Sequence, residues 1–128
     1  MRLDLAAGAA LLLFPMPALA TGGFDCRPAS GAGPRLTMGI SHSLQAIPFS
    51  VTLEEGGRTL STQGDRPALV IGQSWFDSRY LWLDLVDPTL SRREATLRTV
   101  FQPRLKGRPA IGTLVRGGRT YRMRCVEG

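Results

Sequence analysis

Two carboxylates, Asp77 and Asp84, flank the densest aromatic stretch of the sequence, residues 73–82. A glycoside hydrolase needs two such groups a few ångströms apart over a cleft, one as general acid and the other as nucleophile or base. His42 is the only histidine, and the serines on both sides of it do not normally converge on the ring as a nucleophile must. We therefore predict that the protein is not an enzyme, with a hydrolase built on Asp77 and Asp84 as the alternative.

Metal and cofactor sites lack their usual residues. One histidine and two widely separated cysteines do not supply ligands at the spacing of a zinc or copper site. A glycine-rich loop that leads into a helix, the usual cradle for a phosphate group, is also missing from the sequence. The sequence therefore predicts no metal and no cofactor.

A short motif, GGRT, occurs twice, in LEEGGRTL and 61 positions later in LVRGGRTY. Two adjacent glycines between alternating runs predict a two-residue hairpin, because both turn residues need positive φ. Pairing across the turn sets Glu55 against Arg58 in the first hairpin but Arg116 against Arg119 in the second. We interpret the repeat as two uses of one turn and expect uncompensated positive charge at the second tip.

The residues after the second turn extend this charged surface. Arg122 and Arg124 alternate with residues of the core face, so we expect both side chains to point into solvent. Aromatic side chains mixed with arginine, as in residues 73–82, are typical of interface anchors. The predicted partner-binding residues are Arg116, Arg119, Arg122, Arg124, Trp75, Arg79 and Tyr80. The alternatives are a solvated edge that discourages aggregation and ordinary packing at the mouth of a barrel.

Residues 1–20 have the three parts of a secretory signal peptide: Arg2, the apolar run 5–14, and a small-x-small cleavage site that ends at Ala20. The apolar run is shorter than the ~20 residues that a membrane-spanning helix needs. We therefore predict a periplasmic or secreted protein without a transmembrane anchor. After cleavage near Ala20, residues 21–128 are expected to form a single β-barrel-like domain.

The mature part of the chain shows period-two alternation of apolar and polar residues between clusters of Gly, Pro and Asp. The runs predicted as strands are 23–27, 35–40, 49–53, 60–62, 68–72, 80–85 and the hairpin 110–126. Residues 73–79 are predicted as a loop, and 90–102 fit either a short helix or a strand. About eight short strands predict an all-β fold, a small antiparallel barrel or sandwich.

Cys26 and Cys125 are the only cysteines, and they lie close to the two ends of the mature chain. In an oxidising compartment, such an even pair predicts one disulfide bond. The bond would bring the terminal strands side by side, as the closure of a barrel requires.

Three segments of the chain carry a resemblance: Phe24-Asp25-Cys26, Lys106-Gly107-Arg108-Pro109-Ala110, and a closing strand that ends in Cys125. They resemble the Tyr-x-Cys, Lys-Gly-x-x-Ala and terminal-strand segments of the periplasmic c-type lysozyme inhibitor family. The resemblance implies an exported, eight-stranded barrel. The inhibitory Ser-Gly-x-x-Tyr loop of that family is not matched, since Asp77-Ser78-Arg79-Tyr80 has its serine and tyrosine at a different spacing and lacks the glycine.

The net charge of +6 and the pI of about 10.6 set the kind of partner. An exported location argues against nucleic acid and favours an anionic envelope component or an acidic protein. The lysozymes that such inhibitors bind are cationic, so like charge would slow that association. We predict an exported, non-enzymatic binding module of the cell envelope. Lysozyme inhibition and lipocalin-like capture of a small apolar ligand are the alternatives.

Overall fold

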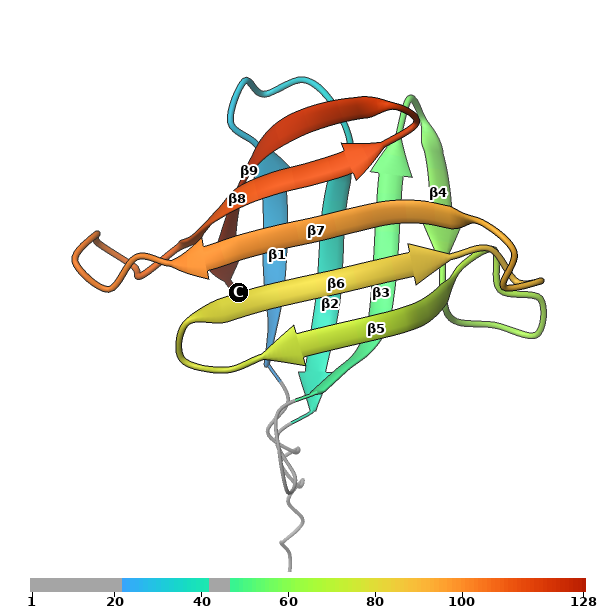
Figure 1. The fold of residues 1–128 in the computed structure, drawn as a ribbon, viewed down its shortest axis with the longest axis horizontal. Helices are drawn as coiled ribbons and strands as arrows, with labels where there is room; N and C mark the ends of the chain where they lie inside the picture. Colours follow the sequence, from blue (N-terminus) through green and yellow to red (C-terminus); the bar gives the residue numbers. More distant parts are fainter. Residues whose placement is uncertain (1–21, 42–46) are drawn as a thin grey trace, which may run out of the picture.

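A computed structural model describes residues 22–41 and 47–128 of the chain, and these residues form nine strands (Figure 1). The strands are β1 (Gly22–Pro28), β2 (Arg35–Ser41), β3 (Ile47–Glu55), β4 (Arg58–Ser61), β5 (Val70–Phe76), β6 (Tyr80–Val86), β7 (Arg93–Phe101), β8 (Ala110–Arg116) and β9 (Arg119–Glu127). The predicted signal peptide, 1–20, and His42 lie outside the described residues.

The strands form one antiparallel sheet in the order β4-β3-β2-β1-β9-β8-β7-β6-β5, so the first and last strands pair at its centre. The sheet curls until β5 to β8 cross in front of β1 to β4, as Figure 1 shows. The segment just before β5 reaches the other edge of the sheet, where the backbone N–H groups of Ala68 and Leu69 donate to the carbonyl oxygen of Ser61 in β4, at 3.0 and 3.2 Å. The result is a curled half-barrel. It confirms the predicted all-β antiparallel fold, with nine strands in place of about eight.

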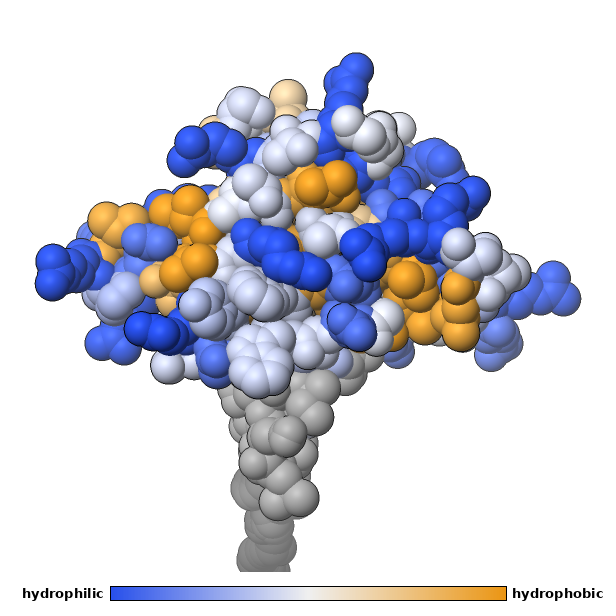
Figure 2. Space-filling view, in the orientation of Figure 1, coloured by the Kyte–Doolittle hydropathy of each residue, from blue (hydrophilic) through white to orange (hydrophobic). Residues whose placement is uncertain are grey.

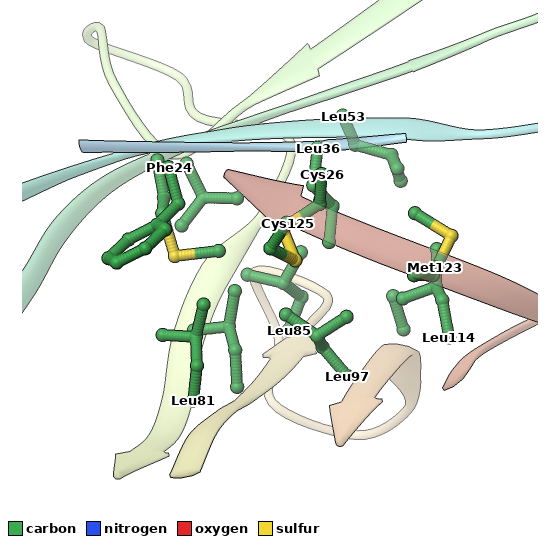
Figure 3. Close-up of a cluster of buried hydrophobic side chains, with 14 of the residues drawn as sticks. Phe24, Cys26, Leu36, Leu53, Leu81, Leu85, Leu97, Leu114, Met123 and Cys125 are labelled. Carbon is green, nitrogen blue, oxygen red and sulfur yellow. A yellow bond between two sulfur atoms is a disulfide. The ribbon is translucent and has the colours of Figure 1, made fainter. Parts of the chain in front are cut away.

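Alternation along each strand places one set of side chains inside the curl. Leu81, Leu83 and Leu85 of β6 are buried there, as predicted, and Leu36 and Leu53 face them from the other half of the sheet (Figure 3). The rest of the buried core comprises Phe24, Cys26, Met38, Ile40, Val51, Leu69, Ala95, Leu97, Ala110, Leu114, Met123 and Cys125. Packed side chains thus occupy the interior, where a lipocalin-like protein would hold its ligand.

The disulfide bond between Cys26 and Cys125 is present. The two residues are direct partners in the ladder between β1 and β9, and both are completely buried. The bond therefore fastens the two strands that lie farthest apart in the sequence, and the prediction is confirmed.

Both Gly-Gly hairpins form in the predicted register. Gly56 and Gly57 have φ values of 57° and 81°, and Gly117 and Gly118 have 59° and 77°, so all four residues occupy the left-handed region. Glycine populates this region at little cost, which explains why the same dipeptide is used at both turns. Across the second turn, Arg116 pairs with Arg119 and Leu114 with Tyr121.

One segment differs from the sequence prediction, and a second segment, which the prediction left open, is now assigned. The sequence predicts a loop at residues 73–76, but they belong to β5: the strand has an irregularity between Ile71 and Gln73 and then continues to Phe76. Trp75 lies opposite Trp82 on the outer face, while Phe76 packs against the core. The ambiguous region 90–102 contains a strand, β7, with Leu97 and Thr99 buried inside.

Candidate functional site

The outer face of β5 to β9 gathers most of the predicted site residues. One row across the sheet contains Trp75, Trp82, Arg98, Thr113 and Arg122, each the direct partner of the next. A neighbouring row contains Tyr80, Val100, Ile111, Arg124 and Arg27. Figure 2 looks onto the front of this face, where hydrophilic side chains lie between patches of hydrophobic residues. The sheet therefore joins the aromatic segment and the second hairpin into one continuous surface.

The aromatic end of this surface lies on β5 and β6. Trp75 is 58% exposed and Trp82 is 36% exposed. The rings of Tyr80 and Trp82 lie 4.9 Å apart between centroids, and the guanidinium carbon of Arg98 lies 5.3 Å from the centroid of Trp82. These contacts hold the aromatic side chains in place while leaving much of their surface open to solvent.

A hollow of about 400 Å³ opens beside these rings. Its lining residues are Gln73, Ser74, Trp75, Trp82, Asp84 and Arg98. Asp84 is 5% exposed, and one of its carboxylate oxygens lies 2.9 Å from Nη1 of Arg98. The hollow thus combines two indole rings with a carboxylate, a guanidinium group and an amide.

Arg116 is not the uncompensated charge that the sequence predicts. Its side chain is 14% exposed, and it forms ion pairs with Glu55 at 3.2 Å and with Glu94 at 2.9 Å. Glu55 and Arg116 occupy the same position in the two GGRT repeats, directly before the glycines. The curl of the sheet brings these positions together, so Arg116 ties β8 to β3 and β7 and is removed from the candidate binding surface.

The carboxylate of Glu94 completes this buried cluster. Arg92 donates a hydrogen bond to it and lowers the pKa of Glu94 below its usual value, against the opposing effect of burial and with further help from Arg116. Glu94 therefore stays ionised at neutral pH and keeps Arg116 paired.

The remaining predicted arginines are exposed. Within the part of the chain that the structure describes, Arg119, Arg122 and Arg124 make no ion pair with any acidic residue. Arg124 lies directly opposite Arg27 in the ladder between β9 and β1. Like charges in this position repel one another, so the strand pair retains a positive potential on its outer side.

Asp25 lies on the outer side of β1, close to Arg27 and Arg124. It bonds Arg27 and Arg35 at 3.0 Å each. Burial by itself would raise the pKa of Asp25, but the hydrogen bonds from Arg35 and Arg27 outweigh it and lower the pKa. Its negative charge is thus shared between these two arginines, while Arg122 and Arg124 have no ion pair among the described residues.

The turn between β5 and β6 contains Arg79, which is exposed. Asp77 holds this turn: it accepts hydrogen bonds from the backbone N–H groups of Arg79 and Tyr80, at 2.7 and 2.8 Å, and from the indole of Trp75 at 2.8 Å. These bonds lower the pKa of Asp77, and the two bonds from the backbone have the largest effect. Asp77 therefore has a structural role in shaping the turn.

Asp77 and Asp84 line different hollows, so the structure does not bring them together over one cleft. Asp77 belongs to a hollow of about 630 Å³ at the mouth of the half-barrel. Phe24, Phe76 and Phe101 pack against one another in this mouth, with ring centroids 5.5 to 5.9 Å apart. This arrangement gives no support to a hydrolase built on the two carboxylates.

Comparison with protein-family models, with curated proteins and with solved structures returned no match. Among the described residues, no helix is long and apolar enough to cross a membrane. The same residues contain no group of three or more His, Cys, Asp and Glu side chains that would hold a metal ion. The functional inference therefore rests on the geometry of the outer face and of the mouth.

Sequence reasoning missed Arg98 and Arg27 as members of this surface. The sequence gives only one indication for either residue, which is that each occupies an outward position of an alternating strand. Which strands lie beside them, and therefore that Arg98 meets Trp82 and Arg27 meets Arg124, depends on the strand order.

Proposed function

We propose that the protein is an exported, non-enzymatic binding module that holds an anionic component of the cell envelope on the outer face of β9 and β1. The observation that carries this proposal is the outward pair Arg122 and Arg124, with Arg124 opposite Arg27 and without ion pairs of their own among the described residues. A row of unpaired guanidinium groups attracts anions over distances of about a Debye length, ~10 Å at 0.1 M salt.

Phosphate groups of glycolipids or phospholipids are the anions that fit best. The guanidinium fork of arginine binds two oxygens of one phosphate at once, which an ammonium group cannot do. Two further exposed arginines add positive charge near the turns: Arg119 lies at the start of β9, and Arg79 lies at the tip of the β5–β6 turn. An acidic protein would use the same charges, and the experiment below separates it from a lipid surface.

The test is binding to vesicles that contain anionic phospholipid. Removal of Arg122 and Arg124 by the double change to alanine should weaken binding by roughly 30-fold, since each basic residue contributes about 1 kcal/mol near such a surface. Wild-type binding should also weaken as salt rises from about 50 to about 300 mM. Co-sedimentation measures both effects.

The matched control replaces Arg66 and Arg104 by alanine, two exposed arginines outside the strands. This control changes the net charge by the same amount but leaves the proposed site intact. It should therefore reduce binding by only a few-fold. Equal losses in the two variants, or binding that salt does not weaken, would contradict a site on β9. Binding to an acidic protein without binding to vesicles would replace the lipid surface as the partner.

We also propose, as a second candidate, inhibition of a lysozyme through the mouth of the half-barrel. Two segments that carry the resemblance to the lysozyme inhibitor family contribute to the mouth hollow: Phe24 comes from β1, and Gly107 and Arg108 come from the loop before β8. Ser78, from the β5–β6 turn where the inhibitory loop of the family is not matched, lines the same hollow. Asp77 and Glu127 line the same hollow and would offer negative charge to a cationic enzyme.

A turbidity assay of cell-wall lysis tests this second role. Micromolar protein should slow the lysis, and the double change of Ser78 and Arg108 to alanine should raise the concentration needed by at least about 10-fold, the usual range for central interface residues. The Arg122 and Arg124 double variant is the control and should inhibit like the wild type. Lysis at an unchanged rate would remove this candidate.

A further inference from the structure

The hollow between Trp75, Trp82 and Arg98 contains a buried polar atom that no described residue satisfies. Oδ1 of Asp84 accepts no hydrogen bond from the described part of the chain. Nη1 of Arg98 lies 2.9 Å away and forms an ion pair with this oxygen. The hydrogen bond that Nη1 donates goes to the carbonyl oxygen of Leu97 instead, at 2.8 Å. The carboxylate therefore has its charge balanced while one oxygen still lacks a hydrogen-bond donor. Buried polar atoms in this condition are rare, because each costs desolvation without a compensating bond.

Two indole rings line the hollow beside this carboxylate. Trp75 and Trp82 are direct partners across β5 and β6. Trp75 is held by the bond from its indole nitrogen to Asp77, and Trp82 is held between Tyr80 and Arg98. A volume of about 400 Å³ lies within the range of small-molecule sites, which is about 300 to 1,000 Å³.

The chemistry of the lining excludes three classes of ligand. A cation would compete with Arg98, which already lies beside Asp84 and over Trp82. An anion would meet the carboxylate of Asp84. A wholly apolar ligand would leave Oδ2 of Asp84 and the amide of Gln73 without partners, and sites built from polar groups strongly reject ligands that cannot pair with them.

A neutral ring with several hydroxyl groups satisfies every group in the hollow. One hydroxyl donates to the carboxylate of Asp84 through Oδ2, others accept from Arg98 and Gln73, and the C–H face of the ring packs on an indole. We propose that this hollow is a binding site for a neutral pyranose unit of a glycan.

This inference goes beyond the proposed function and does not rest on it. The sugar site uses β5, β6 and β7, whereas the anionic site uses β9 and β1. The two share one outer face, with Arg98 and Arg122 separated by Thr113 in the same row. Two strand spacings separate them, roughly 10 Å, so one phosphorylated glycan is long enough to reach both sites.

Intrinsic fluorescence is a direct probe, because Trp75 and Trp82 are the only tryptophans of the chain. We expect chitotetraose, maltotetraose or cellotetraose to cause a saturable change in emission and to reduce quenching by acrylamide. Salt between about 50 and about 300 mM should leave this effect unchanged, since the ligand is neutral. The vesicle-binding test of the proposed function is independent of this experiment, so either result can be positive without the other.

Calorimetry on variants tests the residues. Trp75→Ala, at an exposed position, and Asp84→Asn, which keeps the volume and adds a donor, should each weaken binding of the active tetrasaccharide by at least 10-fold. Val100→Ala, on the outer face of β7 but outside the lining, and the Arg122 and Arg124 double variant should bind like the wild type. Circular dichroism of each variant checks its fold, and Trp75→Ala keeps the test valid where Asp84→Asn does not fold.

Three results would overturn the proposal. The first is the absence of a saturable change with any of the three tetrasaccharides at millimolar concentration. The second is wild-type affinity in both Trp75→Ala and Asp84→Asn. The third is tighter binding of tetramethylammonium than of any of these sugars, which would make the hollow a cation cage.

Discussion

Gly112→Ala is expected to destabilise the protein by at least about 3 kcal/mol, at or beyond the upper end of the usual range for overpacked cores. A Cβ atom at this position would lie 1.9 Å from the carbonyl oxygen of Arg98 and 2.7 Å from the Cα atom of Thr99. Both are backbone atoms of β7, the strand paired with β8, so no side-chain rotation relieves the clash. The two strands would have to separate at the point where the inward side chains of Thr99 and Met123 flank the glycine.

Chemical denaturation of the purified protein measures this effect. Thr113→Ala, at the next position of the same strand and on its opposite face, is the control and should change the free energy of unfolding by less than about 1 kcal/mol, as surface substitutions usually do. Gly128→Ala is a second control, since nothing lies within 4 Å of the added atom. A Gly112→Ala variant as stable as these controls would show that β7 and β8 do not approach one another as closely as described.

Removal of the disulfide bond is expected to cost about 4 to 5 kcal/mol, according to the loop-entropy model for a bond that closes about 100 residues. Cys26 and Cys125 are separated by 99 positions and lie face to face in the central pair of strands. The double change to alanine leaves both positions apolar in a fully buried site, so the main effect is greater freedom of the unfolded chain. A cost of this size is comparable to the whole stability of many domains, about 5 to 15 kcal/mol.

Urea unfolding of the oxidised wild type, of the wild type in excess reductant and of the double alanine variant tests this expectation. The last two should unfold at similar, much lower urea concentrations. An oxidised protein no more stable than its reduced form would contradict a constraint between β1 and β9. Free thiols in the untreated protein, found by mass analysis, would contradict the bond itself.

The two proposals together place two kinds of binding chemistry on the outer face of β5 to β9. Its aromatic end has flat rings and an unsatisfied carboxylate oxygen, whereas its β9 end has guanidinium groups without partners among the described residues. Neither end depends on the interior, which the core side chains fill. Both proposed sites therefore use the outside of the fold, and the packed sheet is the scaffold that positions their side chains.

The sequence by itself determined much of the local structure, although it predicted a loop at residues 73–76 and left 90–102 undecided between helix and strand. The alternation of apolar residues predicts which side chains of β6 and β9 face the core, because successive residues of a strand point to opposite faces whatever the neighbouring strands are. The Gly-Gly pairs predict both hairpins and their registers, because the turn geometry depends on the two residues within it. The disulfide pairing needed no geometry, since Cys26 and Cys125 have no competitors.

Only the tertiary structure decided which outward residues meet. Glu55 neutralises Arg116 across 61 positions of sequence, Arg98 lies over Trp82, and Asp84 is buried beside them. Each of these contacts depends on strand order and on the curl of the sheet. Both are set by the packing of the whole core and by the pairing of β1 with β9, which no local pattern contains. For this reason the sequence identified the types of residue available for binding, and the fold selected the ones that act together.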